Sequence, residues 1–157
     1  MATDGCLVLA NTDVNVLLKT VEPKTTPVLI AQSIDWVQPE TIQASHHSFE
    51  HTFLAWRNAR NRGEMGRTLS FYAQDFNSFG KDLQQYKAAL KRDMKAKRQR
   101  VDNLSLLRWA DHEEVMMVTF DEIGADKSGA QKNRTTRRQY WIRSGNHWKI
   151  FFEGIIG

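Results

Sequence analysis

The stretch YWIRSGNHWKIFFEG, residues 140–154, decides the fold because it holds two strand-forming runs joined by a tight turn. Aromatic and β-branched side chains favour extended backbone, and the Ser-Gly-Asn turn suits a hairpin. Side chains alternate between the two faces of a strand, so Trp148 and Phe152 are expected on one face and Glu153 on the other. The end of the chain is therefore predicted to be antiparallel sheet.

Strand signals also precede this hairpin, and helical signals precede those strands. Polar turns separate four runs rich in β-branched and aromatic residues, at 101–110, 113–123, 134–144 and 147–156. Apolar residues recur at helical spacing in three earlier segments, at 45–63, 64–76 and 80–97. Neither layer can bury its apolar side alone, so the prediction is an α+β fold with three N-terminal helices on a curved, antiparallel four-stranded sheet.

Two motifs in this part of the chain are similar to known domains. Residues 53–76, FLAWRNARNRGEMGRTLSFYAQDF, and the closing residues 140–154 resemble SnoaL-like and ketosteroid-isomerase-like domains of the nuclear transport factor 2 superfamily. The resemblance implies a cone-shaped domain over residues 44–157, with a pocket between the helices and the concave face of the sheet. These motifs consist of residues that build the fold, so they say little about function.

Six residues are candidates to line such a pocket if the face that carries Trp148 is concave. They are Trp56, Tyr72, Asp75, Phe76, Tyr140 and Trp148. The favoured alternative for the aromatic residues is ordinary core packing, and for Asp75 it is a role in closing the second helix. Enzymes of this fold use a buried Asp or an Asp-His pair as a general base. No such pair is evident here, because Asp121 and Glu153 are expected to face solvent.

The N-terminal segment carries a second resemblance. Residues 3–30, TDGCLVLANTDVNVLLKTVEPKTTPVLI, resemble the end of the catalytic domain of YkuD-type L,D-transpeptidases, whose Ser/Thr-x-Gly-Cys motif matches Thr3, Gly5 and Cys6. An Asn-x-Asp turn, a helix at 13–21 and a Thr-Pro-Val strand follow in the same order. The resemblance implies that Cys6 is the nucleophile that attacks a peptidoglycan stem peptide, and that residues 1–37 are a remnant of such a domain.

The chemistry of that family also needs a histidine to activate the thiol. The family places this histidine a little upstream of the cysteine, where this chain has none. The five histidines of the chain are His46, His47, His51, His112 and His147. We therefore expect Cys6 to be inert in this chain, and the parent protein to be the cysteine enzyme.

Composition limits the remaining function classes. The single cysteine cannot form an internal disulfide or a multi-cysteine zinc site, and no metal or cofactor is expected. The mean hydropathy is −0.54, and no apolar run reaches the roughly 20 residues that a membrane span requires. The chain shows no secretory signal. As part of the parent protein, it is expected in the periplasm or cell envelope.

Three functions fit these observations. The first is a noncatalytic accessory module of an L,D-transpeptidase or L,D-carboxypeptidase, which binds peptidoglycan or a partner, or forms a homodimer through its sheet. The second is a small-molecule enzyme of the isomerase or dehydratase kind. The third is binding of an anionic polymer by a basic surface, since the net charge is +4. Its candidate residues are Lys87, Lys91, Lys95 and Arg98. Nucleic acid is not a favoured ligand, because no RNA-recognition, KH or helix-turn-helix pattern accompanies the charge.

Overall fold

A computed structural model describes residues 8–21, 26, 28, 30, 38–95, 100–110, 113–125 and 131–157. The chain divides into two units, Met1–Gln32 and Ser33–Gly157. The motif residues Thr3, Gly5 and Cys6 lie outside the described residues, as does most of the strand expected near residue 28.

The first unit contains one described helix, α1 (Asn11–Thr20), which agrees with the helix predicted at 13–21. Asp13 lies in its first turn and Lys19 in its last turn. Both charges interact favourably with the helix dipole and stabilise the helix. None of its residues is buried. Its apolar side chains, including Leu17 and Leu18, are exposed.

The second unit begins with a long helix, α2 (Pro39–Asn61). It starts six residues before the predicted start at Ser45. Pro39 lies in the first turn, where the missing N–H of proline is tolerated. Gly63 follows it with φ +75, a left-handed conformation that glycine adopts without strain. The predicted end of this helix is confirmed.

The second predicted helix, 64–76, is wrong in its later half. Only α3 (Met65–Leu69) is helical, and the chain then enters the short strand β1 (Tyr72–Asn77). Asp75 therefore lies in a strand, where it is exposed, and it does not close a helix. The third predicted helix is confirmed as α4 (Leu83–Lys95).

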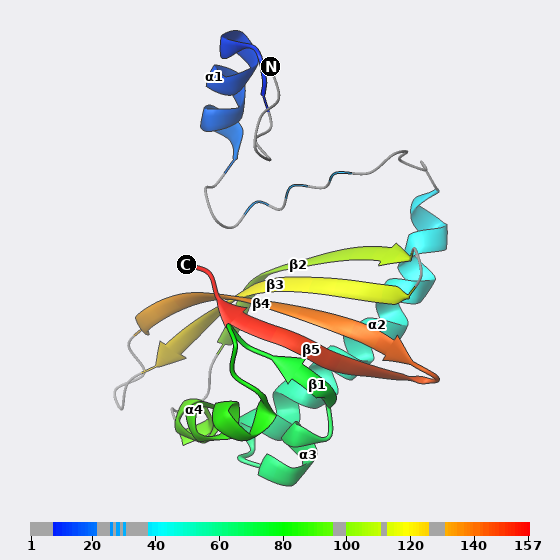
Figure 1. The fold of residues 1–157 in the computed structure, drawn as a ribbon, viewed down its shortest axis with the longest axis vertical. Helices are drawn as coiled ribbons and strands as arrows, with labels where there is room; N and C mark the ends of the chain where they lie inside the picture. The colour runs from blue at the N-terminus through cyan, green and yellow to red at the C-terminus, as the bar shows by residue number, and fades with distance from the viewer. Residues whose placement is uncertain are drawn as a thin grey trace. The chain divides into compact units, whose positions relative to one another are not determined.

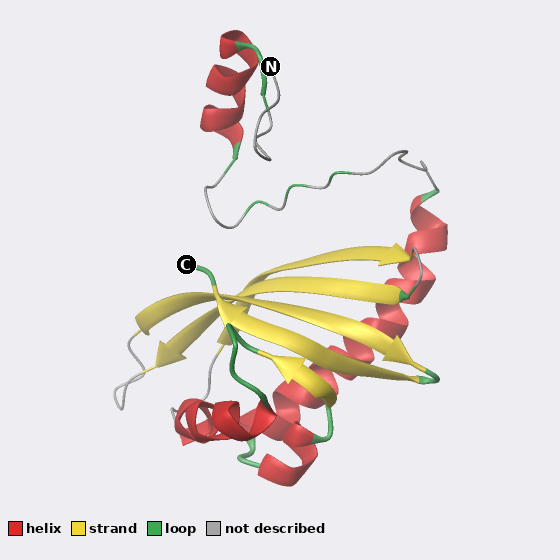
Figure 2. Ribbon diagram, viewed as in Figure 1, coloured by secondary structure: helices red, strands yellow, loops and turns green. Residues whose placement is uncertain are grey.

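The sheet has five strands rather than the predicted four, in the order β1-β5-β4-β3-β2. The four predicted strands are β2 (Arg100–Ala110), β3 (Glu114–Ala125), β4 (Gln131–Ser144) and β5 (His147–Ile155). They form an antiparallel meander, and β1 joins its edge by pairing parallel with β5. The α+β class is confirmed, with the helices of this unit gathered on one side of the curved sheet (Figures 1 and 2).

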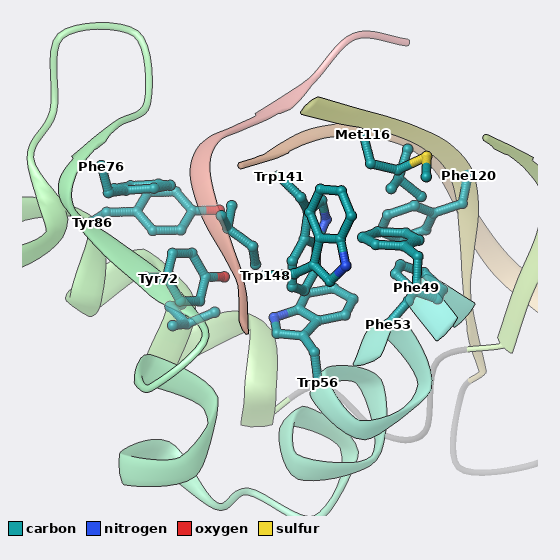
Figure 3. Packing of buried hydrophobic residues seen from close by; sticks show 13 residues of the cluster. Phe49, Phe53, Trp56, Tyr72, Phe76, Tyr86, Met116, Phe120, Trp141 and Trp148 are labelled. Atoms are coloured by element: carbon teal, nitrogen blue, oxygen red, sulfur yellow. The ribbon is translucent and has the colours of Figure 1, made fainter. Parts of the chain in front are cut away.

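An aromatic core joins α2 to the sheet (Figure 3). Phe49 and Trp56 of α2 pack edge-to-face against Trp141 of β4, with ring centroids 5.4 Å and 6.2 Å apart. Phe53 packs in the same way on Phe120 of β3, at 5.2 Å. Edge-to-face pairs at these distances add stability beyond the burial of apolar area, so this face of α2 fixes the helix on the sheet.

An irregularity in β5 changes which side chains face this core. Trp141 pairs with Ile150, whereas the adjacent Tyr140 pairs with Phe152, so β5 carries one extra residue at this point. Such a bulge shifts the alternation of side chains by one position. Trp148 and Ile150 face the core before the bulge, and Glu153 rather than Phe152 is fully buried after it. The alternation predicted for the end of β5 is therefore wrong.

No described helix is long and apolar enough to span a membrane.

Because α4 packs on the core, shortening one of its buried side chains should lower the stability of the fold strongly. Leu90 is 0% exposed, whereas Leu54 of α2 is 42% exposed. Leu90→Ala should lower the free energy of unfolding by about 2–4 kcal/mol, because it removes buried methyl groups and leaves a cavity. The matched change Leu54→Ala should lower it by less than about 1 kcal/mol. Urea denaturation of both variants measures the difference, and equal losses would contradict the placement of α4.

Candidate functional site

The interior between the helices and the sheet holds a carboxylate, Glu153, which is 0% exposed. One of its oxygens accepts hydrogen bonds from the Tyr86 hydroxyl at 2.9 Å and the Arg137 guanidinium at 2.5 Å. The other accepts from the Tyr72 hydroxyl at 2.7 Å and the Gln139 amide at 2.9 Å. Each oxygen thus has two donors, so the capacity of the carboxylate to accept hydrogen bonds is essentially filled.

Arg137 extends this arrangement to two further acids. Its guanidinium contacts Glu122 of β3 at 3.0 Å and Asp93 of α4 at 3.1 Å, in addition to Glu153. Arg137 and Glu122 are each 3% exposed, whereas the Asp93 side chain is 35% exposed. Asp93 therefore lies where the interior meets solvent.

A second guanidinium, that of Arg60, enters from α2. It forms an ion pair with Glu122 and lies 3.6 Å from Asp93. It also lies over the indole of Trp56, 5.4 Å from the ring centroid, at a distance suited to a cation–π contact. We call the whole set the buried charge cluster. It comprises Arg60, Tyr72, Tyr86, Asp93, Glu122, Arg137, Gln139 and Glu153.

The cluster keeps its central carboxylate ionised. Burial alone would raise the pKa of Glu153, but the charges of Arg137 and Arg60 and the hydrogen bonds from its neighbours lower it below the ordinary value of 4.5. Burial, followed by the charge of Glu153, raises the pKa of the Tyr72 hydroxyl well above its usual range. Burial lowers and Glu153 raises the pKa of Arg137, and the net change is upward. Glu153 and Arg137 are therefore charged and the tyrosine neutral at physiological pH.

This arrangement is poorly suited to acid–base catalysis. A general base at neutral pH needs a pKa near 7 and an oxygen within reach of the substrate proton. Glu153 has a lowered pKa, and four donors already surround its oxygens. What the cluster does chemically is hold two helices and four strands together through ion pairs and hydrogen bonds.

The predicted pocket residues separate into three groups. Trp56, Tyr72, Phe76 and Trp148 are buried in the core, and Trp148 also lines a hollow at the hairpin between β4 and β5. Asp75 is exposed on β1. Tyr140 lies on the opposite face of the sheet, because its neighbour Trp141 points into the core; its ring packs on those of Trp109 and Phe152.

Two acids expected in solvent are in fact buried. Glu153 forms the centre of the buried charge cluster, and Asp121 is 4% exposed on the other face of β3. Asp121 accepts hydrogen bonds from Asn103, Arg134 and Thr136. Burial alone would raise its pKa, but these hydrogen bonds lower it below the usual value. It also remains ionised.

Three buried charged residues of the cluster, Arg60, Glu122 and Arg137, were not predicted, although the sequence contains a signal for each. Alternate residues of a strand share a face, so Glu122 is expected on the same face of β3 as Met116, Val118 and Phe120. Arg137 is likewise expected on the same face of β4 as Gln139 and Trp141. Arg60 follows Phe49, Phe53 and Trp56 at helical spacing. Charged residues that continue an apolar stripe are candidates for burial with a partner.

Among the described residues, no three His, Cys, Asp or Glu side chains gather in a way that could hold a metal ion. The lysines of α4 at 87 and 91 are exposed, whereas Arg98 and the side chain of Lys95 lie outside what the structure describes.

Comparison with known proteins identifies the family of the second unit. The family model described as the Cds6 C-terminal NTF2-like domain matches residues 48–154, more than half of the chain. The chain belongs to this family of nuclear transport factor 2-like domains. No curated protein sequence matches it significantly.

Solved structures support the same fold. Bd1075 of Bdellovibrio bacteriovorus is 20% identical, with a TM-score of 0.68 over 96% of this chain and 56% of its own. Pgp2 of Campylobacter jejuni, a helical cell shape determining protein, is 20% identical, with a TM-score of 0.53 over 65% of this chain and 38% of its own. The association domain of CaMKII from C. elegans is 7% identical, with a TM-score of 0.57 over 75% of this chain and 99% of its own. The chain thus spans about half of Bd1075 and less of Pgp2.

The buried charge cluster predicts a strong and pH-dependent effect of Glu153→Gln. Removing this charge leaves Arg137 buried without its closest partner, so the free energy of unfolding at pH 7 should fall by about 3–5 kcal/mol. The lowered pKa of Glu153 stabilises the fold above about pH 4.5, and this contribution is lost as the pH falls through the folded-state pKa. The variant should therefore lose stability less steeply below pH 4.5 than the parent chain, by at most about 1.4 kcal/mol per pH unit.

Urea denaturation between pH 3 and pH 7 measures both effects. Asp75→Asn, which removes an exposed acid from β1, is the control and should change stability by less than about 0.5 kcal/mol. A Glu153→Gln chain as stable as the parent at pH 7 would contradict the central role of this carboxylate.

Proposed function

We propose that residues 44–157 form a noncatalytic accessory module of a bacterial cell-wall L,D-transpeptidase or L,D-carboxypeptidase, which helps the parent enzyme to bind peptidoglycan or a partner. The observation that carries the proposal is the buried charge cluster. Enzymes of this fold need an open interior and a carboxylate with a raised pKa. Here the interior carboxylate of Glu153 has a lowered pKa and four donors. The module therefore acts through its surface.

The N-terminal unit supports the link to a cell-wall enzyme. Thr3, Gly5 and Cys6 match the nucleophile motif of YkuD-type enzymes, and Cys6 would be the nucleophile of the parent protein. The apolar side chains of α1, such as Leu17 at 41% and Leu18 at 67% exposure, fit a helix that packs against a larger catalytic domain. The parent protein would then work in the periplasm or cell envelope.

Two of the similar structures give further support. The likeness to Bd1075 covers 96% of this chain, so it is not confined to the NTF2-like domain. Pgp2 is described as a helical cell shape determining protein, and this chain covers 38% of it. Both proteins therefore contain an NTF2-like domain within a longer chain.

Self-association of the module is part of the same proposal. The sheet face opposite the helices carries the aromatic side chains of Trp109, Tyr140 and Phe152, with Phe79 beside them at 70% exposure. Aromatic groups of this kind favour contacts between proteins. We take the aromatic face as the surface of a homodimer, and the likeness to a domain named for association in CaMKII supports self-association in general.

Binding to purified peptidoglycan sacculi tests the proposal. The chain should sediment with sacculi at 0.1 M salt and retain most of this binding at 0.5 M, because specific contacts are screened less than exposed charges. Lys87→Glu with Lys91→Glu is the matched variant, since both lysines are exposed on α4. It should bind like the parent chain.

Two outcomes would contradict the proposal. If the chain does not bind sacculi at either salt concentration, the module has no affinity for the wall. If binding disappears at 0.5 M and in the double lysine variant, the basic surface of α4 binds an anionic polymer instead.

A further inference from the structure

A hollow of about 480 Å³ lies on the second unit, where α2 approaches the hairpin between β4 and β5. Its volume is within the usual range of small-ligand sites, about 300–1,000 Å³. Three separate segments line it: one turn of α2, the residues just before β1, and the hairpin. The lining residues are His51, Thr52, Ala55, Ser70, Phe71, Asn146, His147, Trp148 and Lys149.

The lining offers nitrogen hydrogen-bond donors and contains no acid. It includes the imidazoles of His51 and His147 and the ammonium of Lys149, with no Asp or Glu among the lining residues. Two acids near this region are engaged elsewhere: Glu50, next to His51 in the sequence, and Glu114, which contacts Arg143 just before the hairpin. Glu50 pairs with His47, and Glu114 pairs with Arg108 and Arg143. The hollow therefore favours an anionic group.

Lys149 is held in place at this hollow. Its ammonium donates a hydrogen bond to the backbone carbonyl of Ser70, which ties β5 to the segment before β1. The Phe71 carbonyl accepts a further bond from the Ile150 amide at 2.7 Å. An ammonium has three donors, so the bond to Ser70 leaves capacity for a carboxylate.

The remaining lining supplies an apolar wall and neutral polar groups. Trp148 is 6% exposed and is fixed by an edge-to-face contact with Phe49, at 5.2 Å between ring centroids. Phe71 also lines the hollow, and its ring packs on Trp141. The Thr52 hydroxyl and the Asn146 amide can exchange hydrogen bonds with a peptide group.

We propose that this hollow binds the terminal carboxylate of a short peptide, with Lys149, His51 and His147 facing the carboxylate and the Trp148 side receiving a small apolar side chain. The choice of a peptide rests on the proposed function, in which the natural ligand is the stem peptide of the cell wall. Charge-assisted hydrogen bonds are stronger than neutral ones, so the carboxylate provides much of the affinity.

Titration of the full chain with acetyl-L-alanyl-D-alanine, followed by NMR, tests this inference. The backbone amide signals of His147 and Lys149 should shift and saturate. The C-terminal amide of the same dipeptide, which lacks the charge, should bind at least about fivefold more weakly. The double variant His51→Ala with His147→Ala should also bind the acid at least about fivefold more weakly. Both histidines are exposed, so the fold should be unaffected.

His47→Ala is the matched control, because His47 lies one turn before His51 on α2 but does not line the hollow. It should bind the acid like the parent chain. Equal affinity for the acid and the amide, no shift at the hairpin, or full affinity in the double variant would each overturn the inference.

The two proposals fail in different ways. Sacculi binding without a shift at the hairpin would overturn this site and leave the accessory function standing. Saturable binding of the acid at the hollow without any affinity for sacculi would support the site and contradict the accessory function.

Discussion

The ionised carboxylate of Glu153 is the group on which the second unit depends. Tyr72 of β1, Tyr86 of α4 and Arg137 of β4 all donate hydrogen bonds to it, so three elements converge on one residue of β5. A buried carboxylate without partners would be strongly destabilising, and a filled set of donors removes that penalty. Arg137 also forms an ion pair with Glu122, and Glu122 forms one with Arg60. Arg60 thereby connects the cluster to α2.

This constraint bears directly on function. This fold often encloses a ligand in its interior. In this protein the interior is filled by charged side chains and by edge-to-face aromatic pairs beside them. Making room for a substrate in the interior would separate Arg137 from Glu153. Each charge would then lose this partner while it stays shielded from water. The surfaces of the module are free of this constraint, and they include the hollow at the hairpin and the aromatic sheet face.

The class of fold follows from the sequence because hydrophobic periodicity marks most of its elements. The four strands of the meander and the helices α2 and α4 have clear patterns, whereas β1 does not. Its six residues follow α3 after two intervening residues, and among the described strands they pair with β5 alone, so a long-range contact decides their conformation. Local pattern alone made the run from Phe71 to Phe76 look helical.

The candidate site was harder to predict, for two physical reasons. The bulge in β5 reverses the alternation between Ile150 and Glu153, and it depends on pairing with β4 that the sequence of β5 does not reveal. The burial of Arg60, Glu122 and Arg137 depends on the three residues meeting in space, although each continues an apolar stripe. The direct measurement is a ¹³C NMR pH titration of the Glu153 side-chain carboxyl in the intact chain. We expect a midpoint below the ordinary value of 4.5, because the charge of Arg137 and the hydrogen-bond donors stabilise the ionised form. A midpoint near 6 or above, as a general base requires, would contradict it.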